Sequence, residues 1–391
     1  MSGYDHIIAG AGCAGLSLLV NMIHSGEFGG QKILLVDRAP KTQNDRTWCF
    51  WEKEAGLFEP VVYRSWDKLW FHGEKYSSLK DIRPYRYKMI RGIDFYNYCF
   101  GLIGKQPNIT VEYGTVEGMV SDGLQTFVTL NGEKIPARYI FNSILPTRPL
   151  HPASPIDVPG QPRGRWNLLQ HFKGWVIGTE RPFFRPEEAT LMDFRVSQQQ
   201  GSAFVYTMPL SDSAALVEYT VLSENLLQQT AYEEGLRNYL HDVLHLDGYT
   251  VMEEEFGVIP MTDHPFGGLE NHILHIGTAG GQTKASSGYT FQFIQQQSRE
   301  IVRALSETGV PSVPSASGRF RFYDKVLLNV LASGKLPGEK IFTRLFSGNR
   351  ITDIFSFLDN GTRLTQELRI IGSLPTGPFL RAGLQELTRR E

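Results

Sequence analysis

The stretch Tyr4-Asp5-His6-Ile7-Ile8-Ala9-Gly10-Ala11-Gly12-Cys13-Ala14-Gly15 decides the fold of this chain. A short apolar run leads into a glycine-rich turn with the spacing G-x-G-x-x-G, and the apolar residues of 16–23 then indicate a helix. A second apolar run, 32–36, ends at Asp37. This order predicts a strand, a tight turn, a helix and a second strand, which is the βαβ unit that binds a dinucleotide.

The glycines of this turn each have a physical role at a dinucleotide. Gly10 permits the tight turn, Gly12 lets a pyrophosphate approach the backbone, and Gly15 allows the helix to pack closely on the strand. The phosphate then sits at the positive end of the helix, where Cys13 and Ala14 are further candidate contacts. The three glycines therefore predict a phosphate-binding turn.

Other candidate cofactor contacts follow this unit. Asp37 stands at the end of the second strand, where its carboxylate can accept hydrogen bonds from a ribose. A motif so close to the start of a chain that later leaves the βαβ pattern favours FAD over NAD. Arg38, Arg46 and Thr47 are added as candidate contacts, as is Arg91, for which a surface position is the alternative.

A second glycine-rich turn supports FAD. A predicted strand at 272–276 precedes it, and a predicted helix at 290–305 follows it. In flavoproteins of this type, such an element places backbone N–H groups against the pyrophosphate and the flavin ring. The candidate contacts are Gly277, Thr278, Gly280, Gly281, Gly288 and Tyr289. Threonine follows Gly277, where aspartate usually binds the ribityl chain, so we expect either that this contact is made differently or that the flavin is held less conventionally. A buried glycine-rich turn without a ligand is the remaining alternative.

Composition narrows the class of protein. A length of 391 residues predicts two or three lobes, and a net charge of -2 gives no reason to expect a nucleic-acid partner. Three cysteines without C-x-x-C spacing favour a reducing compartment over a disulfide framework, and no metal site is expected. No secretory signal or membrane-spanning run is visible, so a cytoplasmic protein, soluble or peripheral to the membrane, is expected.

The middle of the chain abandons the βαβ pattern. Three apolar runs at 189–196, 203–210 and 214–222 have short polar connections, which indicates an antiparallel meander. We therefore expect an α/β protein with a Rossmann-like FAD-binding fold, an antiparallel β-sheet substrate domain and a helical C-terminal region. The expected parts are the FAD domain at 1–75, its continuation with substrate-domain insertions at 76–150, the substrate domain at 151–262, the last FAD part at 263–310, and a helical lobe at 311–391 that begins with a linker at 311–318.

Several longer motifs resemble those of bacterial lycopene β-cyclases, over about residues 4–383. The matching segments are Asp45–Trp51, Leu191–Val196, Ala215–Thr220, Gly257–Thr262, Gly277–Gly281 with Gly288-Tyr289, Phe357–Asp359, Leu374-Pro375 and Pro378–Leu380. The resemblance implies conversion of the linear ends of lycopene, or of another acyclic carotenoid, to β-rings without net redox change. It also implies reduced FAD as cofactor, with NAD(P)H as the external reductant.

That reaction needs an acid that protonates an alkene. Because an alkene is a very weak base, the acid has to be neutral and dry, and burial raises the pKa of a carboxyl enough to keep it protonated. Glu218 lies in an apolar run, where alternation places it on one face with Leu216 and Thr220. It also matches the position of the family's essential glutamate. An exposed strand glutamate is the alternative.

A second carboxylate and several aromatic side chains are further candidates. Asp193, expected in the neighbouring strand, either assists Glu218 as a base or pairs with Arg195. Aromatic faces stabilise cations, and the aromatic candidates are Trp48, Phe50, Trp51, Tyr206 and Tyr219. A reduced, anionic flavin would add negative charge near the cation, which would explain a redox cofactor in a reaction without redox change.

The C-terminal region suggests how an apolar substrate is reached. Phe, Leu, Ile and Val alternate with Lys and Arg over 320–346, as in a helix that lies on a membrane surface, and capping of the substrate lobe is the alternative. A flavin-dependent monooxygenase or prenyl reductase is the first rival for the whole chain, and a prenyl-lipid carrier without activity is the second. The choice of one or both lycopene ends, β or ε rings, and the oligomeric state stay open.

Overall fold

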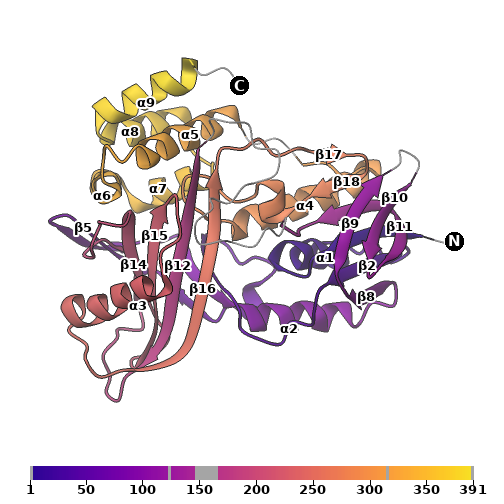
Figure 1. Ribbon diagram of the computed structural model, residues 1–391, viewed down its shortest axis with the longest axis horizontal. Helices are drawn as coiled ribbons and strands as arrows, with labels where there is room; N and C mark the ends of the chain where they lie inside the picture. Colours follow the sequence, from indigo (N-terminus) through magenta and orange to yellow (C-terminus); the bar gives the residue numbers. More distant parts are fainter. Residues whose placement is uncertain (1–2, 122–124, 146–165, 314–316, 389–391) are drawn as a thin grey trace.

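The computed structural model describes residues 3–121, 125–145, 166–313 and 317–388, and this part of the chain forms two sheet domains and a helical lobe (Figure 1). The segment 151–165, with which the expected substrate domain begins, and the residues 314–316 of the expected linker lie outside it. The described elements combine an α/β domain with a largely parallel sheet, a second domain with a mainly antiparallel sheet, and a helical C-terminal region. The expected fold class is thereby confirmed.

The first domain is built on a sheet whose central strands are parallel. Its path is β17-β18-β11-β1-β2-β8; β10 joins it antiparallel to β11, and β9 pairs antiparallel to β10. The strands are β1 (Tyr4–Ala9), β2 (Ile33–Asp37), β8 (Ile109–Tyr113), β9 (Val116–Ser121), β10 (Thr126–Leu130), β11 (Glu133–Asn142), β17 (Leu269–Glu270) and β18 (Ile273–His275). The predicted βαβ unit is present as β1, α1 and β2, with β1 parallel to β2.

Helices cover one face of this sheet, and the β9–β10 hairpin covers the other. The helices are α1 (Cys13–Ser25), α2 (Gly92–Ile103) and α4 (Phe291–Thr308). Fully buried residues such as Leu16, Leu19 and Ile301 fill the helix side, whereas Ile7, Val36 and Val128 fill the hairpin side. Because the strands are covered on both faces, they are continuously apolar, as is usual for parallel sheets.

The second domain is a seven-stranded sheet with the order β16-β12-β15-β14-β13-β5-β6. Its strands are β5 (Lys68–Gly73), β6 (Tyr76–Asp81), β12 (Asn167–Gly178), β13 (Glu188–Asp193), β14 (Ser202–Pro209), β15 (Ala214–Ser223) and β16 (Thr250–Thr262). The expected meander is β13, β14 and β15, all antiparallel. The early strands β5 and β6 also join this sheet, through parallel pairing of β5 with β13.

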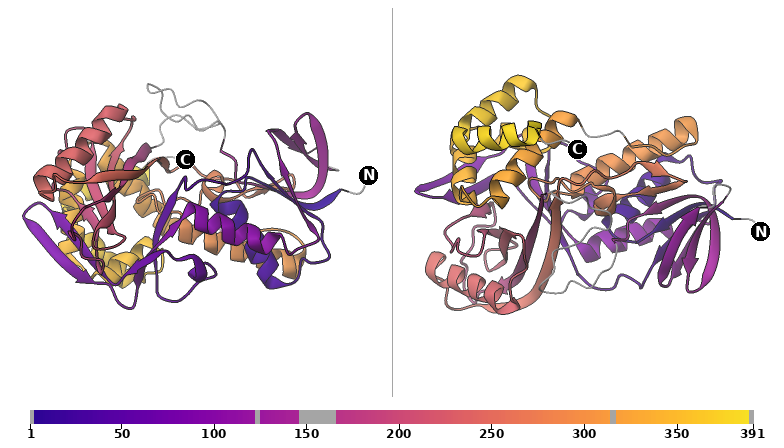
Figure 2. Two further views of the ribbon diagram at one scale, coloured as in Figure 1. Left: turned by 90° about the horizontal axis from the view of Figure 1, so that it is seen from below. Right: turned by 45° about the horizontal axis from the view of Figure 1, so that its top comes forward.

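The two faces of the seven-stranded sheet pack against different partners. The helix α3 (Gln229–Asn238) and the π-helical turn Tyr239–Val243 cover one face. The other face packs on the C-terminal helices and on a three-stranded sheet of β3 (Thr47–Glu52), β7 (Arg86–Arg91) and β4 (Arg64–Trp66). Figure 2 shows α3 and the C-terminal helices on opposite sides of the long strands. The small sheet therefore lies where the two domains meet.

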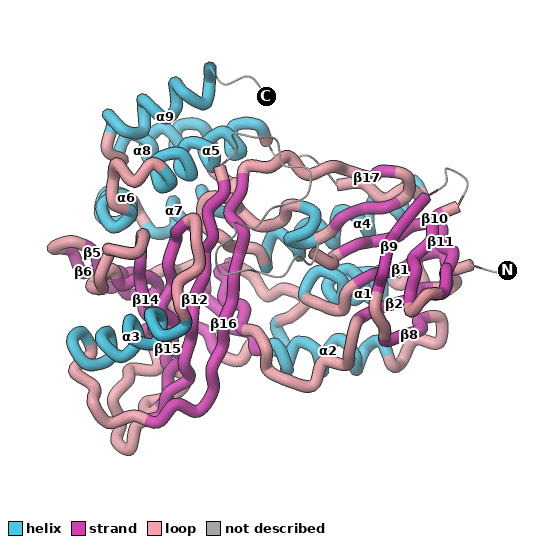
Figure 3. Tube along the Cα trace, viewed as in Figure 1, coloured by secondary structure: helices cyan, strands magenta, loops and turns pink. Residues whose placement is uncertain are grey.

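The C-terminal helices form a lobe beside the seven-stranded sheet, away from the eight-stranded one (Figure 3). They are α5 (Gly318–Ala332), α6 (Gly338–Gly348), α7 (Ile351–Leu358), α8 (Leu364–Ser373) and α9 (Thr376–Thr388). Two short 3-10 turns among the described residues, η1 (Glu59–Val61) and η3 (Gly277–Gly280), complete the description. A buried Lys284 ties this lobe to the second glycine turn, since its Nζ donates to Asp324 at 2.9 Å and to Asn360 at 2.8 Å.

The apolar residues of 320–346 do not face solvent, which corrects the expected membrane segment. Phe320, Leu328 and Val330 of α5, with Phe342 and Phe346 of α6, are all buried. They pack against the seven-stranded sheet and against one another, because the lobe has to bury its own apolar face. The alternative, that these residues cap the substrate lobe, describes their positions. Within the described residues, no helix combines the length and apolar character needed to cross a bilayer.

Candidate functional site

The first glycine turn is shaped by close packing at Gly10 and Gly15. A Cβ atom at Gly15 would lie 2.0 Å from the Gly10 carbonyl oxygen, and one at Gly10 would lie 2.3 Å from Ser143 Oγ. Gly10 also has a φ of 101°, a conformation that favours glycine. By contrast, no atom lies within 4 Å of a Cβ at Gly12, which precedes the first residue of α1. The turn therefore leaves open space directly before a helix N-terminus.

Asp37 borders this turn as expected from the sequence. Its Oδ2 accepts a hydrogen bond from the Ala11 N–H at 2.6 Å, and its Oδ1 lies 3.3 Å from Lys41 Nζ. Arg38, next to it, is exposed. Cys13, at the start of α1, has its pKa raised to about 12 by burial. The Cys13 thiol is therefore neutral. Because Cys13 is the first residue of α1, its candidate contact with a phosphate is through its backbone N–H.

The second glycine turn packs directly on the first. A Cβ at Gly277, whose φ is 61°, would lie 2.4 Å from the Cβ of Ala14. The Gly277 N–H is held by Gln297 Oε1 at 2.8 Å, and a Cβ at Gly280 would lie 2.1 Å from the His275 carbonyl oxygen. Both glycine turns therefore meet at the N-terminus of α1. This is the arrangement that a bound dinucleotide requires.

The remaining candidate contacts of this turn have identified partners. Gly281 and Gly288 have φ values of 74° and 72°, so both positions favour glycine. Thr278 Oγ1 accepts a hydrogen bond from Thr283 at 3.3 Å. A Cβ at Gly288 would lie 2.5 Å from Gln170 Oε1 on β12, so this loop approaches the seven-stranded sheet. The turn thus connects the dinucleotide side with the sheet.

The residues of the β3 start link the glycine turns to the seven-stranded sheet. Arg46 is exposed and its charge acts on the Cys13 thiol. Thr47 Oγ1 donates to Glu255 Oε2 of β16 at 2.8 Å. Arg91, at the end of β7, forms an ion pair with Asp94 at 2.6 Å and lies over the ring of Tyr63. Arg91 therefore has a local partner within the domain.

Glu218 lies on the face of β15 that turns toward this junction. Its Oε1 accepts a hydrogen bond from Thr220 Oγ1 at 2.9 Å, on the predicted alternation. Its side chain keeps some accessible surface but is surrounded by protein. Burial raises the pKa of Glu218 well above its usual range, and the neighbouring Glu255 raises it further, while Thr220 acts in the opposite direction. The environment of the Glu218 carboxyl therefore favours its protonated form.

Glu255 was not identified from the sequence. It lies on β16, and its carboxyl is close enough to Glu218 to raise the pKa of that residue further, after the larger effect of burial. Both glutamates are in register with Gly174 of β12, the strand between them. The run Glu253-Glu254-Glu255 is typical of a solvent-exposed strand end, and only the pairing of β16 with β12 brings its last member next to Glu218. The glycine in β12 was the available signal, because a strand glycine marks a close approach.

Aromatic residues and one cysteine surround the two carboxyls. Burial raises the pKa of Tyr206 well above its usual range, and the neighbouring Tyr289 adds to this effect. Burial also raises the pKa of Tyr289 to about 12, while Tyr206 and Tyr87 act in the opposite direction. Burial likewise raises the pKa of Cys49, with further contributions from Glu218 and Glu255. These groups stay neutral around neutral pH, so they present dipoles and ring faces and carry no competing charge.

Of the aromatic candidates, Trp51 and Tyr206 belong to the group of residues that surrounds Glu218 and Glu255. The ring centroid of Trp51 lies 4.3 Å from that of Tyr289, and its Nε1 donates to Asp359 Oδ2 at 2.9 Å. Trp48 and Phe50 instead pack on Phe291 within the first domain. Tyr219 lies on the α3 face of the sheet. Sequence position alone therefore did not distinguish the aromatic residues around the two carboxyls from those that pack elsewhere in the protein.

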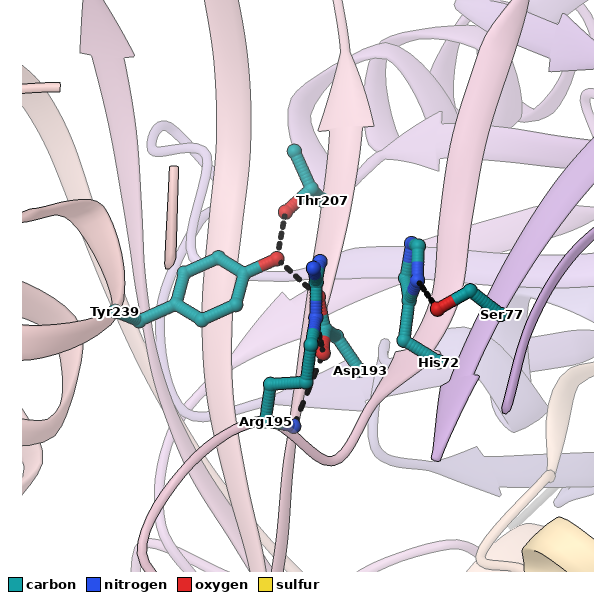
Figure 4. A network of polar contacts seen from close by, with 6 residues as sticks. All are labelled: His72, Ser77, Asp193, Arg195, Thr207 and Tyr239. Atoms are coloured by element: carbon teal, nitrogen blue, oxygen red, sulfur yellow. Dashed lines mark hydrogen bonds and ion pairs between the residues drawn. The ribbon is translucent and has the colours of Figure 1, made fainter. Parts of the chain in front are cut away.

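Asp193 lies on the α3 face of the sheet, where Figure 4 shows it beside Tyr239 and Arg195. Glu218 stands between Val217 and Tyr219, which point to that face, so its own side chain lies on the other one. The expectation that the strand of Asp193 neighbours that of Glu218 is wrong, because β14 runs between β13 and β15. Asp193 is fully buried, and both of its oxygens accept hydrogen bonds from Arg195, the shortest at 2.6 Å. Tyr239 Oη donates to it at 3.0 Å. Pairing with Arg195, the second of the two alternatives, describes its environment.

These observations fit a dinucleotide at the junction of the two domains. Open space at Gly12, the helix N-terminus behind it, Asp37 beside it and the second glycine turn against it provide each feature that a pyrophosphate and a ribose need. The carboxyl pair lies beside the same junction through Thr47 and Tyr289. Among the described residues, no three His, Cys, Asp or Glu side chains gather as a metal site would require.

Solved structures with this architecture are flavoproteins and related enzymes. A geranylgeranyl bacteriochlorophyll reductase-like protein from Thermoplasma acidophilum has a TM-score of 0.57 at 10% identity, covering 99% of this chain and 96% of its own. A flavoprotein/dehydrogenase from Cytophaga hutchinsonii has a TM-score of 0.58 at 13% identity, covering 99% of both chains. At such identities these similarities show the fold alone.

Sequence comparison is more specific. Residues of a lycopene β-cyclase from Paracoccus sp. are 29% identical to this chain over 162 positions, which is 40% of either protein. A lycopene β-cyclase from Pseudescherichia vulneris is 40% identical over 75 positions, 18% of this chain and 19% of the relative. The aligned segments thus span less than half the length of these relatives. The model of the lycopene cyclase protein family matches residues 5–384, and the chain therefore belongs to the lycopene cyclase family.

Proposed function

We propose that the protein is a lycopene β-cyclase that converts the linear ends of lycopene to β-rings by acid–base chemistry, with FAD as its cofactor. Membership of the lycopene cyclase family supports a carotenoid substrate. The observation that carries the mechanism is the environment of Glu218, a carboxyl enclosed by protein beside the two glycine turns that could bind a dinucleotide. The reductase and monooxygenase rivals share the fold, whereas the family model that matches residues 5–384 is that of the lycopene cyclases.

The cofactor would be held by the two glycine turns and Asp37. Gly12 leaves room for the pyrophosphate, and the start of α1 supplies N–H groups and the positive end of the helix dipole. Gly277 and Gly280 bring the second turn against the same helix. When bound in its reduced, anionic form, with NAD(P)H as the ultimate reductant, FAD supplies negative charge next to the forming cation.

The acid step follows from the environment of Glu218. Its proton is transferred to a terminal double bond of the substrate, so the O–H bond breaks as a C–H bond forms. The second double bond then attacks the tertiary cation and closes the ring. A ring C–H bond breaks to form the new double bond, and its proton passes to the Glu218 carboxylate, which restores the acid. The faces of Trp51, Tyr206 and Tyr289 stabilise the cation by about 0.5–2 kcal/mol each and exclude the water that would quench it.

The function can be tested by expression of the chain in bacterial cells that accumulate lycopene. We expect the red pigment to be replaced by β-carotene, with γ-carotene as the intermediate, when the extracts are separated and identified by mass and absorption spectrum. Purified protein should form the same product with reduced FAD, and NADPH consumption should not rise in proportion to product. Unchanged lycopene, or a reduced or oxygenated product formed with stoichiometric NADPH, would exclude the proposal in favour of a rival.

We propose that the chain meets its apolar substrate at a membrane surface formed by α8 and α9. Five leucines on these helices are largely exposed: Leu364 (58%), Leu368 (60%), Leu380 (61%), Leu384 (56%) and Leu387 (70%). The exposed side chains of Arg363, Arg369 and Arg381 stand beside them. Exposed leucines with flanking arginines are typical of helices that bind the headgroup region of anionic membranes.

The leucine surface gives a direct prediction. The double variant Leu380→Asp, Leu384→Asp is expected to lower binding to anionic phosphatidylglycerol vesicles by about tenfold or more, since two leucines no longer bury their area in lipid. Cosedimentation with the vesicles measures this. Val120→Asp, at a 51% exposed position on β9, is the matched control and should leave binding unchanged. Equal binding by the double variant would place the membrane contact elsewhere.

A further inference from the structure

Glu255 carries a buried acceptor that no hydrogen bond satisfies. Within the described part of the chain its Oε1 has no hydrogen-bond partner, whereas its Oε2 accepts the Thr47 hydroxyl at 2.8 Å. Oε1 lies toward Gly174, and Glu218 stands on the other side of that glycine. Two ionised carboxylates offer only acceptors, so the Glu218 carboxyl can satisfy this oxygen only when it carries a proton.

The backbone brings the two carboxyls together at a glycine. Gly174 on β12 is opposite Glu218 on one side and opposite Glu255 on the other. A Cβ atom there would lie 2.9 Å from Glu255 Cγ, 3.1 Å from Glu255 Oε1 and 3.1 Å from Leu216 Cδ1. Any larger residue at this position would displace the Glu255 side chain. The side chains of β15 and β16 thus meet over the strand that separates them.

The surroundings of the pair assign the proton to one side. Glu255 accepts the Thr47 hydroxyl and lies near the positive charge of Arg46, and both favour its ionised form. The negative charge of Glu253 acts in the opposite direction. Glu218 instead faces the neutral groups Cys49, Tyr206 and Tyr289. Negative charge is therefore better accommodated on Glu255.

We infer that Glu218 and Glu255 hold a single proton between them across Gly174, and that Glu255 is a positioning residue that keeps this proton on Glu218. The inference rests on the proposed function, in which Glu218 is the acid. It explains how the Glu218 carboxyl keeps its proton, and so stays neutral, at neutral pH. An isolated buried carboxyl would depend on desolvation alone. The pair adds an ionised partner that makes loss of the proton unfavourable.

An infrared titration of the purified protein with bound flavin tests this without substrate. The protonated carboxyl that disappears in Glu218→Gln should be visible in the wild type at neutral pH as a carboxylic C=O band. In Glu255→Gln the midpoint at which this band is lost should move down by about one pH unit or more, because the ionised neighbour is gone. Arg46, Glu253, Cys49 and the tyrosines are present in both proteins, so they cannot produce the difference.

Gly174→Ala tests the geometry separately from the charge. It should shift the band in the same direction as Glu255→Gln, since the new methyl group displaces the Glu255 side chain. Gly178→Ala is the matched control on the same strand and face, where a Cβ would meet only the flexible Met252 side chain at 3.3 Å. It should leave the midpoint unchanged. If Gly174→Ala does not fold, the Glu255→Gln result decides alone.

The pH profile of cyclisation gives the second measurement. Because the acid works only when protonated, activity falls as pH rises through the pKa of Glu218, and Glu255→Gln should move this upper limb to lower pH. An infrared midpoint that does not fall in Glu255→Gln overturns the shared proton. A shifted midpoint in a protein that does not cyclise lycopene retains the carboxyl pair and overturns the proposed function instead.

Discussion

Replacement of Glu218 by glutamine is expected to reduce cyclisation of lycopene by about 100- to 10,000-fold, the range that a general acid contributes. Glutamine keeps the size of the side chain and can still accept the hydrogen bond from Thr220, but it has no proton that an alkene can take. The rate of β-ring formation by purified protein with reduced FAD measures the loss.

The controls for Glu218→Gln separate chemistry from folding. The variant should retain its flavin and its thermal midpoint, because it removes a carboxyl that is costly to ionise in the folded protein. Glu254→Gln, an exposed neighbour of Glu255 on β16, should cyclise lycopene at the normal rate, since Lys173 keeps its second partner Glu233. Normal β-ring formation by a folded, flavin-loaded Glu218→Gln protein would remove this residue from the mechanism.

The second large effect is expected at Gly12. A Cβ atom there meets no protein atom within 4 Å, so a valine variant should fold, but its side chain occupies the space that the pyrophosphate needs. We expect the affinity for FAD to fall by about a hundredfold or more, with activity lost in parallel. Flavin absorbance of the purified protein and titration of the apoprotein with FAD measure this change.

Two other glycines are comparators for Gly12→Val. Gly15→Ala should reduce the yield of folded protein, because its methyl group would lie 2.0 Å from the Gly10 carbonyl oxygen. Gly101→Ala, in the exposed part of α2 and free of contacts within 4 Å, should bind FAD normally. A folded Gly12→Val protein that binds FAD as tightly as the wild type would show that the cofactor lies elsewhere.

Local patterns were sufficient for the dinucleotide domain. The apolar run of β1, the three glycines and Asp37 are close in sequence, and each is required by the same turn, so strand, helix and strand could be predicted in order. The antiparallel strands β13, β14 and β15 were predicted for the same reason. The face of Glu218 also followed from alternation, since Thr220 two residues later contacts it.

Long-range pairing could not be predicted from the same patterns. The strand between Asp193 and Glu218 and an irregularity in the pairing of β13 decide which face Asp193 occupies, and neither leaves a local signature. Glu255 becomes part of the site only because β16 pairs with β12 in one register. A shift of one residue would turn its carboxyl to the α3 face, so its role depends on pairing between distant segments.

The buried ammonium group of Lys284 has a consequence for how the chain can be divided. It is compensated by Asp324 and Asn360, which belong to the C-terminal lobe, while its backbone belongs to the loop that leads to Tyr289. Deletion of that lobe would remove both partners of the Lys284 ammonium, and loss of one partner of a buried ion pair costs about 3–5 kcal/mol. We therefore expect a chain that ends before α5 to lose stability at the second glycine turn as well.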